Sequence, residues 1–130
     1  DEHTIDNQAR LQNHERFNFV ALAGERFIGC VSGIAHQNGD QFNGWCYLTD
    51  LFVEKDYRRR GLGAQLLQSL EEKLRQHGID KIYTWTAGYE APGFYLKQGY
   101  LIFAELENWY STGHSQVGLR KTLKLPEEIS

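Results

Sequence analysis

The sequence has few cysteines, and this shortage excludes two classes of small domain. Two cysteines in 130 residues are too few for the disulfide framework of a small secreted protein. Neither has the C-x-x-C or Cys/His spacing of a metal or redox site. Cys30 and Cys46 each lie in an apolar or aromatic run, so we expect two buried free thiols, with a disulfide as the alternative. The cysteine content predicts a reducing, cytoplasmic compartment and no bound metal.

Long apolar runs and an excess of positive charge are also absent from the sequence. No segment approaches the roughly 18 consecutive apolar residues of a membrane-spanning helix, and we find no signal-peptide pattern. The net charge of −3 disfavours a sequence-independent nucleic-acid binder, because such a protein needs a basic face. We therefore predict that neither a membrane nor a nucleic acid is a partner.

The composition that remains is typical of an ordinary globular domain. Hydrophobic residues make up 41% and charged residues 24% of the chain, which is too apolar for a disordered protein. A length of 130 residues suits one domain with one core. We assign this domain to residues 17–125, between a polar lead-in at 1–16 and a tail at 126–130. Because the chain begins without Met, we expect the lead-in to be trimmed or to hold partial N-terminal elements.

Hydrophobic periodicity predicts the elements of the domain. Two β-rich runs flank a glycine turn at residues 24–25, which is a hairpin signal. Residues 37–44 have the composition of a loop, and residues 45–53 are a nearly continuous apolar run, typical of a central strand buried on both faces. An amphipathic helix follows over residues 63–78. The remaining expected elements are a strand at 81–86, a helix at 91–98, and strands at 100–106 and 116–125.

The order strand, helix, strand across residues 45–86 indicates the fold class. Two strands joined through a helix imply a parallel crossover, so we predict an α/β domain, which some schemes class as α+β. The polar stretch between the first strand and the helix then lies at the carboxyl end of a strand, where open α/β sheets bind their ligands.

That stretch reads DYRRRGLGAQLL over residues 56–67 and has the features of an anion site. A helix that begins at Gly63 leaves its first N–H groups unpaired and presents the positive end of its dipole. Gly61 and Gly63 let the backbone approach a phosphate closely. The stretch is not a dinucleotide fingerprint, because Leu66 stands where that motif needs glycine, and it lacks the Gly-Lys-Ser/Thr of a P-loop. A solvated basic turn, or a basic loop that binds another protein, is the alternative.

Two motifs, in this order along the chain, resemble those of the GCN5-related N-acetyltransferases. The first is Arg58-x-x-Gly61-x-Gly63, which is similar to the family's Gln/Arg-x-x-Gly-x-Gly/Ala motif for pyrophosphate. The second is GFYLKQGY at residues 93–100, which is similar to the family's aromatic-Tyr-x-x-x-Gly-aromatic signature. The resemblance implies a mixed, mostly antiparallel sheet with a central parallel β-α-β crossover and splayed strands, flanked by helices.

The resemblance also implies that acetyl-CoA is the co-substrate. Its pyrophosphate is expected on main-chain N–H groups of residues 59–64, and its pantetheine arm in the gap beside residues 51–53. This family often carries Asn where Gly88 or Tyr89 stands here, so a CoA-binding regulatory module without turnover stays open. The implied cofactor site comprises Leu51, Phe52, Val53, Arg58, Arg59, Arg60, Gly61, Leu62, Gly63 and Ala64.

Acid–base chemistry adds two catalytic candidates. An alkylamine with a pKa of about 10.4 is protonated at neutral pH, so its acetylation needs a base. Asp50 is the first candidate, because a carboxylate in an apolar strand should be paired or have a raised pKa, and related polyamine acetyltransferases carry an acidic residue here. A structurally satisfied buried Asp is the alternative. Tyr95 is the expected proton donor to the CoA thiolate, with a packed core tyrosine as the alternative.

The acceptor is the least determined part of the prediction. Acidic and aromatic side chains on the expected acceptor side favour a small cationic primary amine, with a protein N-terminus or side chain as the alternative. Neither cysteine has the setting of a nucleophile, so the acetyl group is expected to pass directly to the amine. A homodimer stays open. The candidate acceptor-binding residues are Tyr47, Glu90, Glu105 and His114. Alternative bases are Glu90, Glu105, Glu107 and His114, with a solvated surface group without a role as the alternative for each.

Overall fold

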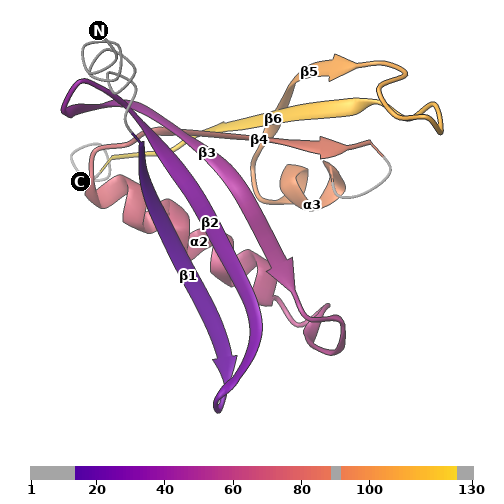
Figure 1. Ribbon diagram of the computed structural model, residues 1–130, viewed down its shortest axis with the longest axis horizontal. Helices are drawn as coiled ribbons and strands as arrows, with labels where there is room; N and C mark the ends of the chain where they lie inside the picture. The colour runs from indigo at the N-terminus through magenta and orange to yellow at the C-terminus, as the bar shows by residue number, and fades with distance from the viewer. Residues whose placement is uncertain (1–13, 89–91, 126–130) are drawn as a thin grey trace, which may run out of the picture.

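The computed structural model describes residues 14–88 and 92–125, which form one six-stranded sheet (Figure 1). Its strand order is β1-β2-β3-β4-β6-β5, and within these residues only the β3-β4 pair is parallel. No helix of this described part is long and apolar enough to cross a membrane. The elements are β1 (His14–Ala23), β2 (Arg26–Asn38), β3 (Gln41–Val53), the 3-10 turn η1 (Lys55–Tyr57), α2 (Leu62–Gln76), β4 (Lys81–Ala87), α3 (Pro92–Lys97), β5 (Leu101–Leu106) and β6 (Gln116–Thr122).

The first three strands form an antiparallel meander with two tight turns. The predicted hairpin at residues 24–25 is confirmed, with Gly24 at a φ of 65°. The predicted loop at residues 37–44 is wrong, because β2 ends at Asn38 and β3 begins at Gln41. Gly39, at a φ of 67°, lets the chain reverse there, and Phe42 packs on Phe17 with ring centroids 6.4 Å apart. These contacts hold a polar stretch within the sheet.

A β-bulge changes which face of the sheet the residues of β3 point to. Ser32 and Gly33 of β2 pair with Asp50 and Leu48, so Thr49 is one residue more than β2 provides. Before the bulge Cys46 and Leu48 are buried, whereas after it Leu51 and Val53 pack against the core. The prediction of a strand buried on both faces is therefore wrong, and so is the burial expected for Asp50, which the bulge leaves exposed.

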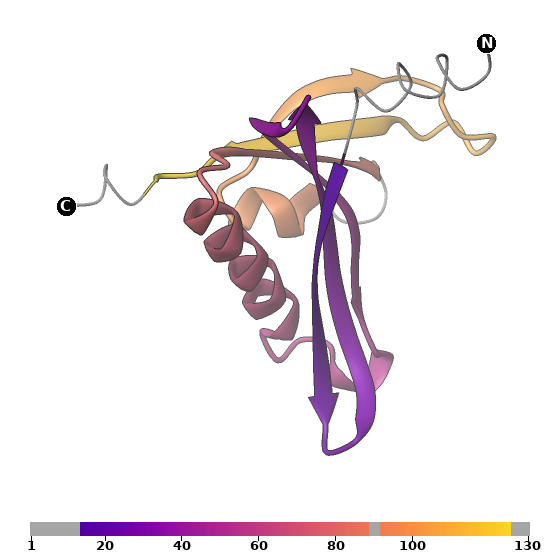
Figure 2. The same cartoon turned by 60° about the vertical axis from the view of Figure 1, so that its left-hand side comes forward.

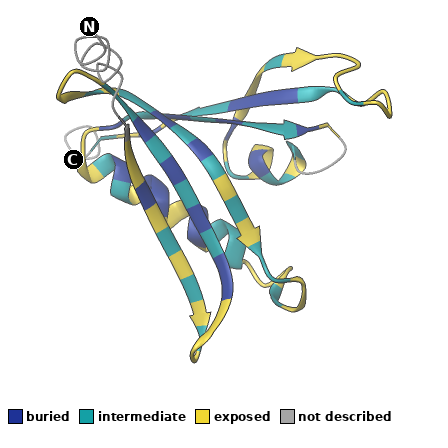
Figure 3. Ribbon diagram, viewed as in Figure 1, coloured by how far each residue is buried: buried dark blue, intermediate teal, exposed yellow. Residues whose placement is uncertain are grey.

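Helix α2 covers one face of the meander (Figures 1 and 2). It begins one residue before the predicted start, after Gly61 at a φ of 80°, and Gly78 at 75° follows its end. Its apolar stripe is fully buried against the sheet, as Figure 3 shows by the dark bands along α2, β2 and β3. The helix is therefore held by its core face, as the sequence periodicity predicts. The buried leucines of this stripe are Leu66, Leu67, Leu70 and Leu74.

One buried carboxylate ties α2 to the second half of the sheet. Glu71 is only 2% exposed, and its oxygens accept hydrogen bonds from the Tyr100 hydroxyl at 2.8 Å and the Lys121 ammonium at 3.0 Å. Burial, followed by the charge of Glu71, raises the pKa of Tyr100. Because both partners come from outside the helix, this network fixes α2 against β6 and the turn between α3 and β5.

The central strands β3 and β4 pair over a short length and then diverge. Their parallel register joins residues 45–47 to residues 81–83. Next to this contact the Thr84 hydroxyl donates to the Leu48 carbonyl at 3.0 Å. A side chain here takes the place of the backbone N–H that would bond a neighbouring strand. Beyond it β3 runs away from β4, as Figure 1 shows. The mixed, mostly antiparallel sheet with a parallel crossover and splayed strands is thus confirmed.

Candidate functional site

The gap between the diverging strands is lined by main-chain groups of β3. The Glu54 N–H donates to the Ile28 carbonyl at 2.8 Å, so the backbone groups of Glu54 point toward β2. Alternate residues of a strand point their N–H and C=O to opposite sides, so those of Val53 and Leu51 point into the gap. Consistent with this, the Val53 carbonyl accepts a bond from Arg58 Nε at 2.9 Å.

The arginine loop follows directly after this strand and ends in the first turn of α2. The Gln65 N–H donates to the Gly61 carbonyl at 3.0 Å, which places the amides of residues 62–64 ahead of the helical ladder. Arg59 has a φ of 65°, a left-handed conformation that side chains rarely adopt. With Gly61 also left-handed, the loop turns sharply and presents successive amides outward.

Three adjoining cavities connect this loop to the gap. The first, of about 640 Å³, lies over the loop and the start of α2, and the second, of about 410 Å³, shares Val53, Arg58 and Gly63 with it. The third, of about 360 Å³, lies between β3 and β4 and shares Leu51 and Tyr95 with the second. A ligand with a charged head and a narrow arm therefore has a path from the arginines to the gap.

Tyr95 lies at the junction of the second and third cavities. Its side chain comes from α3, is 8% exposed, and packs edge-on against Phe94 and Tyr100. Within the described residues the structure shows no hydrogen bond from its hydroxyl to another protein group. Burial raises the pKa of Tyr95 to about 12, so the phenol stays protonated through the neutral range. It is a hydrogen-bond donor on a side chain that lines the path.

Asp50 lines the third cavity, opposite β4. It reaches this position as an exposed side chain on the bulged part of β3 and not as the buried carboxylate expected from the apolar run. Thr84, Thr86 and Tyr110 share the cavity with it. The structure thus brings the two catalytic candidates, Asp50 and Tyr95, to one cavity.

The other predicted residues do not all lie in the three cavities. Of the cofactor candidates, Arg60 is exposed and stacks over Tyr57 at 5.1 Å, and the Phe52 ring stacks on Phe27 at 6.1 Å. Tyr47 lies outside the three cavities and stacks on Tyr83. Glu105 and Glu107 are exposed and lie outside them too, as does His114, whose carbonyl accepts the Tyr110 N–H in the β5-β6 turn. Glu90 lies outside the described residues.

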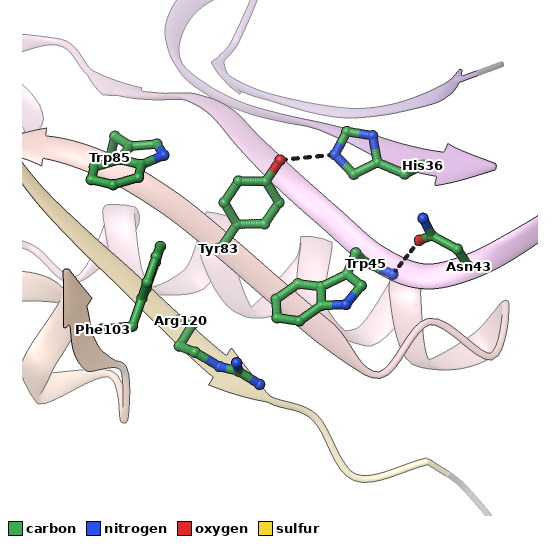
Figure 4. A pocket seen from close by; sticks show the side chains of 7 residues that line it. All are labelled: His36, Asn43, Trp45, Tyr83, Trp85, Phe103 and Arg120. Carbon is green, nitrogen blue, oxygen red and sulfur yellow. Dashed lines mark hydrogen bonds between the residues drawn. The ribbon is translucent and has the colours of Figure 1, made fainter. Parts of the chain in front are cut away.

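The sequence did not reveal a second hollow, which we call the aromatic pocket. Its volume is about 440 Å³, and Figure 4 shows its side chains standing on the sheet face away from α2. In the sequence, aromatic residues recur two positions apart at 45 and 47 and at 83 and 85, which places each pair on one face of a strand. This repetition could have indicated the pocket. The pocket is lined by His36, Asn43, Trp45, Tyr83, Trp85, Phe103 and Arg120.

Comparison with known proteins identifies the family. Residues 1–100 match the acetyltransferase (GNAT) family. The chain belongs to this family. Both GNAT motifs lie on the path described above, the first in the arginine loop and the second on α3. Among the described residues, no group of three or more His, Cys, Asp or Glu side chains is arranged to hold a metal ion.

Curated relatives of this GNAT chain are matched over very different shares of their own length. It is 31% identical over 102 residues to N-alpha-acetyltransferase 30 of Schizosaccharomyces pombe, covering 75% of this chain and 65% of that protein. Two curated relatives from Danio rerio and Aeropyrum pernix are matched over only 22% and 10% of their length.

Solved structures share the fold. A Bacillus cereus acetyltransferase superposes with a TM-score of 0.76 at 24% identity, covering 94% of this chain and 91% of that one. An aminoglycoside 6'-N-acetyltransferase complexed with coenzyme A has a TM-score of 0.70 at 20% identity, covering 94% and 81%.

Proposed function

We propose that this domain transfers an acetyl group from acetyl-CoA directly to a primary amine. The observation that carries the proposal is the path from the arginine loop to the gap, with the main chain of Leu51 and Val53 on one side and Tyr95 at its end. Family membership supports the choice of acetyl-CoA, because the two GNAT motifs line this path.

The residues of the loop fit the phosphates of CoA. The amides of residues 62–64 offer donors at a helix N-terminus, and Arg58 and Arg59 supply positive charge in the same cavity. A side chain on Gly63 would project between Phe94 and Val53, with its Cβ 3.6 Å and 3.7 Å from their atoms. Glycine keeps that space open for a bulky anion.

The gap provides the groups that the acyl transfer requires. A neutral amine attacks the thioester carbon, the carbon–sulfur bond breaks, and the thiolate takes up a proton. Asp50 accepts the proton of the incoming ammonium ion, and the nitrogen loses a second proton to water as the amide forms. A main-chain N–H of Leu51 or Val53 stabilises the negative charge on the thioester oxygen. Tyr95 donates its hydroxyl hydrogen to the sulfur. The pKa of Tyr95 is about 12, above that of a thiol near 8.5, so the phenolate left on Tyr95 is a strong base. It takes up a proton from solvent after each turnover.

We propose a small cationic amine as the acceptor, because the Asp50 carboxylate is exposed in the gap and attracts an ammonium ion. A protein amine is the second candidate, and the similarity to N-alpha-acetyltransferase 30 favours it. The free thiols of Cys30 and Cys46 support the cytoplasmic location. The homodimer stays a prediction, to be tested by sedimentation.

Calorimetry with acetyl-CoA, followed by an assay of thiol release with a panel of amines, tests the proposed function. A ligand that binds only the folded state at a hundredfold excess over its Kd stabilises the protein by about 2.7 kcal/mol. We expect a matching rise in Tm and release of free CoA with at least one amine. Binding without release would indicate a regulatory CoA-binding module, and the absence of binding heat would refute the acetyl-CoA site.

A further inference from the structure

The aromatic pocket is built by close packing across several strands. Tyr83 lies at its centre, stacked on Tyr47 at 5.1 Å and edge-on to Trp45 at 5.7 Å. His36 Nε2 and the Tyr83 hydroxyl lie 2.9 Å apart in a hydrogen bond, drawn as a dashed line in Figure 4. Burial, together with neighbouring Tyr47, raises the pKa of Tyr83, so its phenol stays neutral. The pocket presents fixed aromatic surfaces.

One glycine is required for the far wall of the pocket. Trp85 and Phe103 meet edge-on over Gly118, with ring centroids 5.4 Å apart at 66°. A Cβ on Gly118 would stand 2.8 Å from the Phe103 ring and 2.9 Å from Trp85, closer than packing allows. Phe103 nevertheless remains 47% exposed, so apolar ring surface is available to a further group.

The charge of the pocket differs from that of the gap. Arg120 contributes a guanidinium 4.7 Å from the Trp45 ring centre, and the Lys81 ammonium lies 5.4 Å from the same ring. No carboxylate lines the pocket, and the ammonium of Lys81 beside it is paired with Asp80. Among the described residues Arg120 has no ion-pair partner, so its guanidinium is the uncompensated charge of the pocket. A second positive charge on a ligand would therefore be repelled here, whereas a neutral or anionic ring would be held.

The aromatic pocket and the gap meet at Trp85, which lines both. We propose that the acceptor is an arylalkylamine, whose amine reaches Asp50 in the gap while its aromatic ring packs on Trp85, Tyr83 and Phe103. This inference rests on the proposed function and narrows its acceptor from any small cationic amine to one with a single ammonium group and a ring. Arg120 disfavours aliphatic diamines, because their second ammonium group would lie near its guanidinium.

Ligand binding can be measured without turnover through tryptophan fluorescence. Titration of the protein with 2-phenylethylamine, in the absence of acetyl-CoA, is expected to give a saturable change in emission. Trp85→Phe should remove more of that change than Trp45→Phe, because the ligand ring is proposed to pack on Trp85, and Trp109→Phe should keep it, because Trp109 is 57% exposed and lies outside the pocket. The absence of a saturable change, or its persistence in Trp85→Phe with loss in Trp109→Phe, would overturn the proposal.

Kinetics with acetyl-CoA test the charge argument. Wild type should favour 2-phenylethylamine over 1,5-diaminopentane, a diamine of similar length, by at least about tenfold in kcat/KM, the ratio expected for about 1.4 kcal/mol. Arg120→Glu should bring the two amines to within about threefold, a difference of less than 1 kcal/mol. Arg16→Glu is the matched control, because it makes the same charge change on β1, at the opposite edge of the sheet.

The outcomes separate this inference from the proposed function. If acetyl-CoA fails to bind, the proposed function is wrong. If acetyl-CoA binds and the diamine is acetylated as fast as the aryl amine, only the arylalkylamine assignment is wrong. A similar loss of preference in Arg16→Glu and Arg120→Glu would show an effect of net charge alone and would also overturn it.

Discussion

The two halves of strand β3 have different surroundings. Residues 45–47 have a strand on each side, β2 and β4, whereas residues 51–53 have β2 on one side and the cavities on the other. The change occurs at the bulge around Thr49. Yet both halves keep a face toward the core, since Cys46 and Leu48 are buried in the first half and Leu51 and Val53 pack against the core in the second. The strand can thus expose its backbone to a ligand without loss of its core face.

The two halves differ in whether side chains or main-chain groups determine the effect of a substitution. In the paired half, packing between side chains holds the sheet together, and a substitution acts through stability. In the open half, the groups that line the path are backbone amides and carbonyls, so the sequence there is constrained by space and by backbone conformation. The predictions below test this contrast.

Gly63→Val should have the largest effect on function. The γ-carbons of valine would fill the space in front of the first amides of α2, so the affinity for acetyl-CoA should fall by more than about 100-fold, or about 2.7 kcal/mol. A Cβ at Gly63 makes only ordinary contacts, so the fold should survive. Calorimetry gives the affinity and denaturation gives the stability. An unchanged affinity in the folded variant would remove the loop from the site.

Gly61→Ala is the matched control for that experiment. A Cβ at Gly61 meets nothing within 4 Å, but its φ of 80° is unfavourable for alanine. This variant should therefore lose stability, by about 1 kcal/mol, with a smaller change in affinity.

Tyr95→Phe should lower turnover by roughly 10²-fold, within the range of general acid catalysis, and leave affinity for acetyl-CoA nearly unchanged. The denaturation midpoint should not move, because no protein group of the described part accepts its hydroxyl hydrogen. Tyr100→Phe should show the reverse, because its hydroxyl donates to buried Glu71. There we expect a loss of about 1–3 kcal/mol in stability with normal turnover. Turnover of Tyr95→Phe within about threefold of wild type would contradict the acid role.

Asp50→Asn should raise KM for the amine by about tenfold, with a smaller fall in kcat, because an exposed carboxylate acts through a screened charge and water can replace it as the base. The effect should shrink as salt is added. Glu105→Gln, which removes an equally exposed charge outside the cavities, should change neither constant. If both variants behave alike, Asp50 has no special role.

Cys46→Ala should have the smallest effect on function, and the pH dependence of its stability should differ from wild type only in alkali. Burial raises the pKa of the Cys46 thiol from 9.0 to about 12. The unfolded thiol therefore ionises first, and stability present below pH 9 is lost as the pH rises toward 12. At pH 10 the thiol accounts for about 1.4 kcal/mol of this loss. Denaturation midpoints from pH 8 to 10.5 should fall less steeply in Cys46→Ala, and parallel slopes would contradict the assignment.

Local sequence signals predicted the parts of this structure that local forces determine. Helix α2, with its leucine period and glycine ends, and the two motifs on the path could be read from contiguous residues. The loop predicted at 37–44 failed because polar composition does not show whether a segment pairs with a neighbouring strand. The predicted burial of Asp50 is wrong because the bulge, which leaves this side chain exposed, depends on the register with β2.

The aromatic pocket shows the same limit at the level of a site. Its lining comes from five strands, and its far wall depends on the absence of a side chain at Gly118. Each aromatic residue alone is compatible with a core position. Only the sheet order, with β6 between β4 and β5, brings Trp85 and Phe103 together.

The short parallel contact between β3 and β4 has a consequence for the order of folding. The meander is built from contacts close in sequence, whereas residues 45–47 meet residues 81–83 only after a crossover through α2. Since local contacts form fastest, we expect the meander and α2 to assemble first. The backbone of the β4-β6-β5 group joins the meander through only three residue pairs, and side chains such as Ile82 and Leu119 share its buried core beside the Glu71 network.

Such an attachment should be detectable in amide hydrogen exchange. The free energy needed to open a unit that is held by few backbone contacts is lower than the free energy of unfolding the whole molecule. We expect amides of β4 and β6 to exchange through an opening that leaves β1 and β2 protected. On this expectation, the gap proposed for the ligand arm also marks the boundary between two cooperative units of the chain.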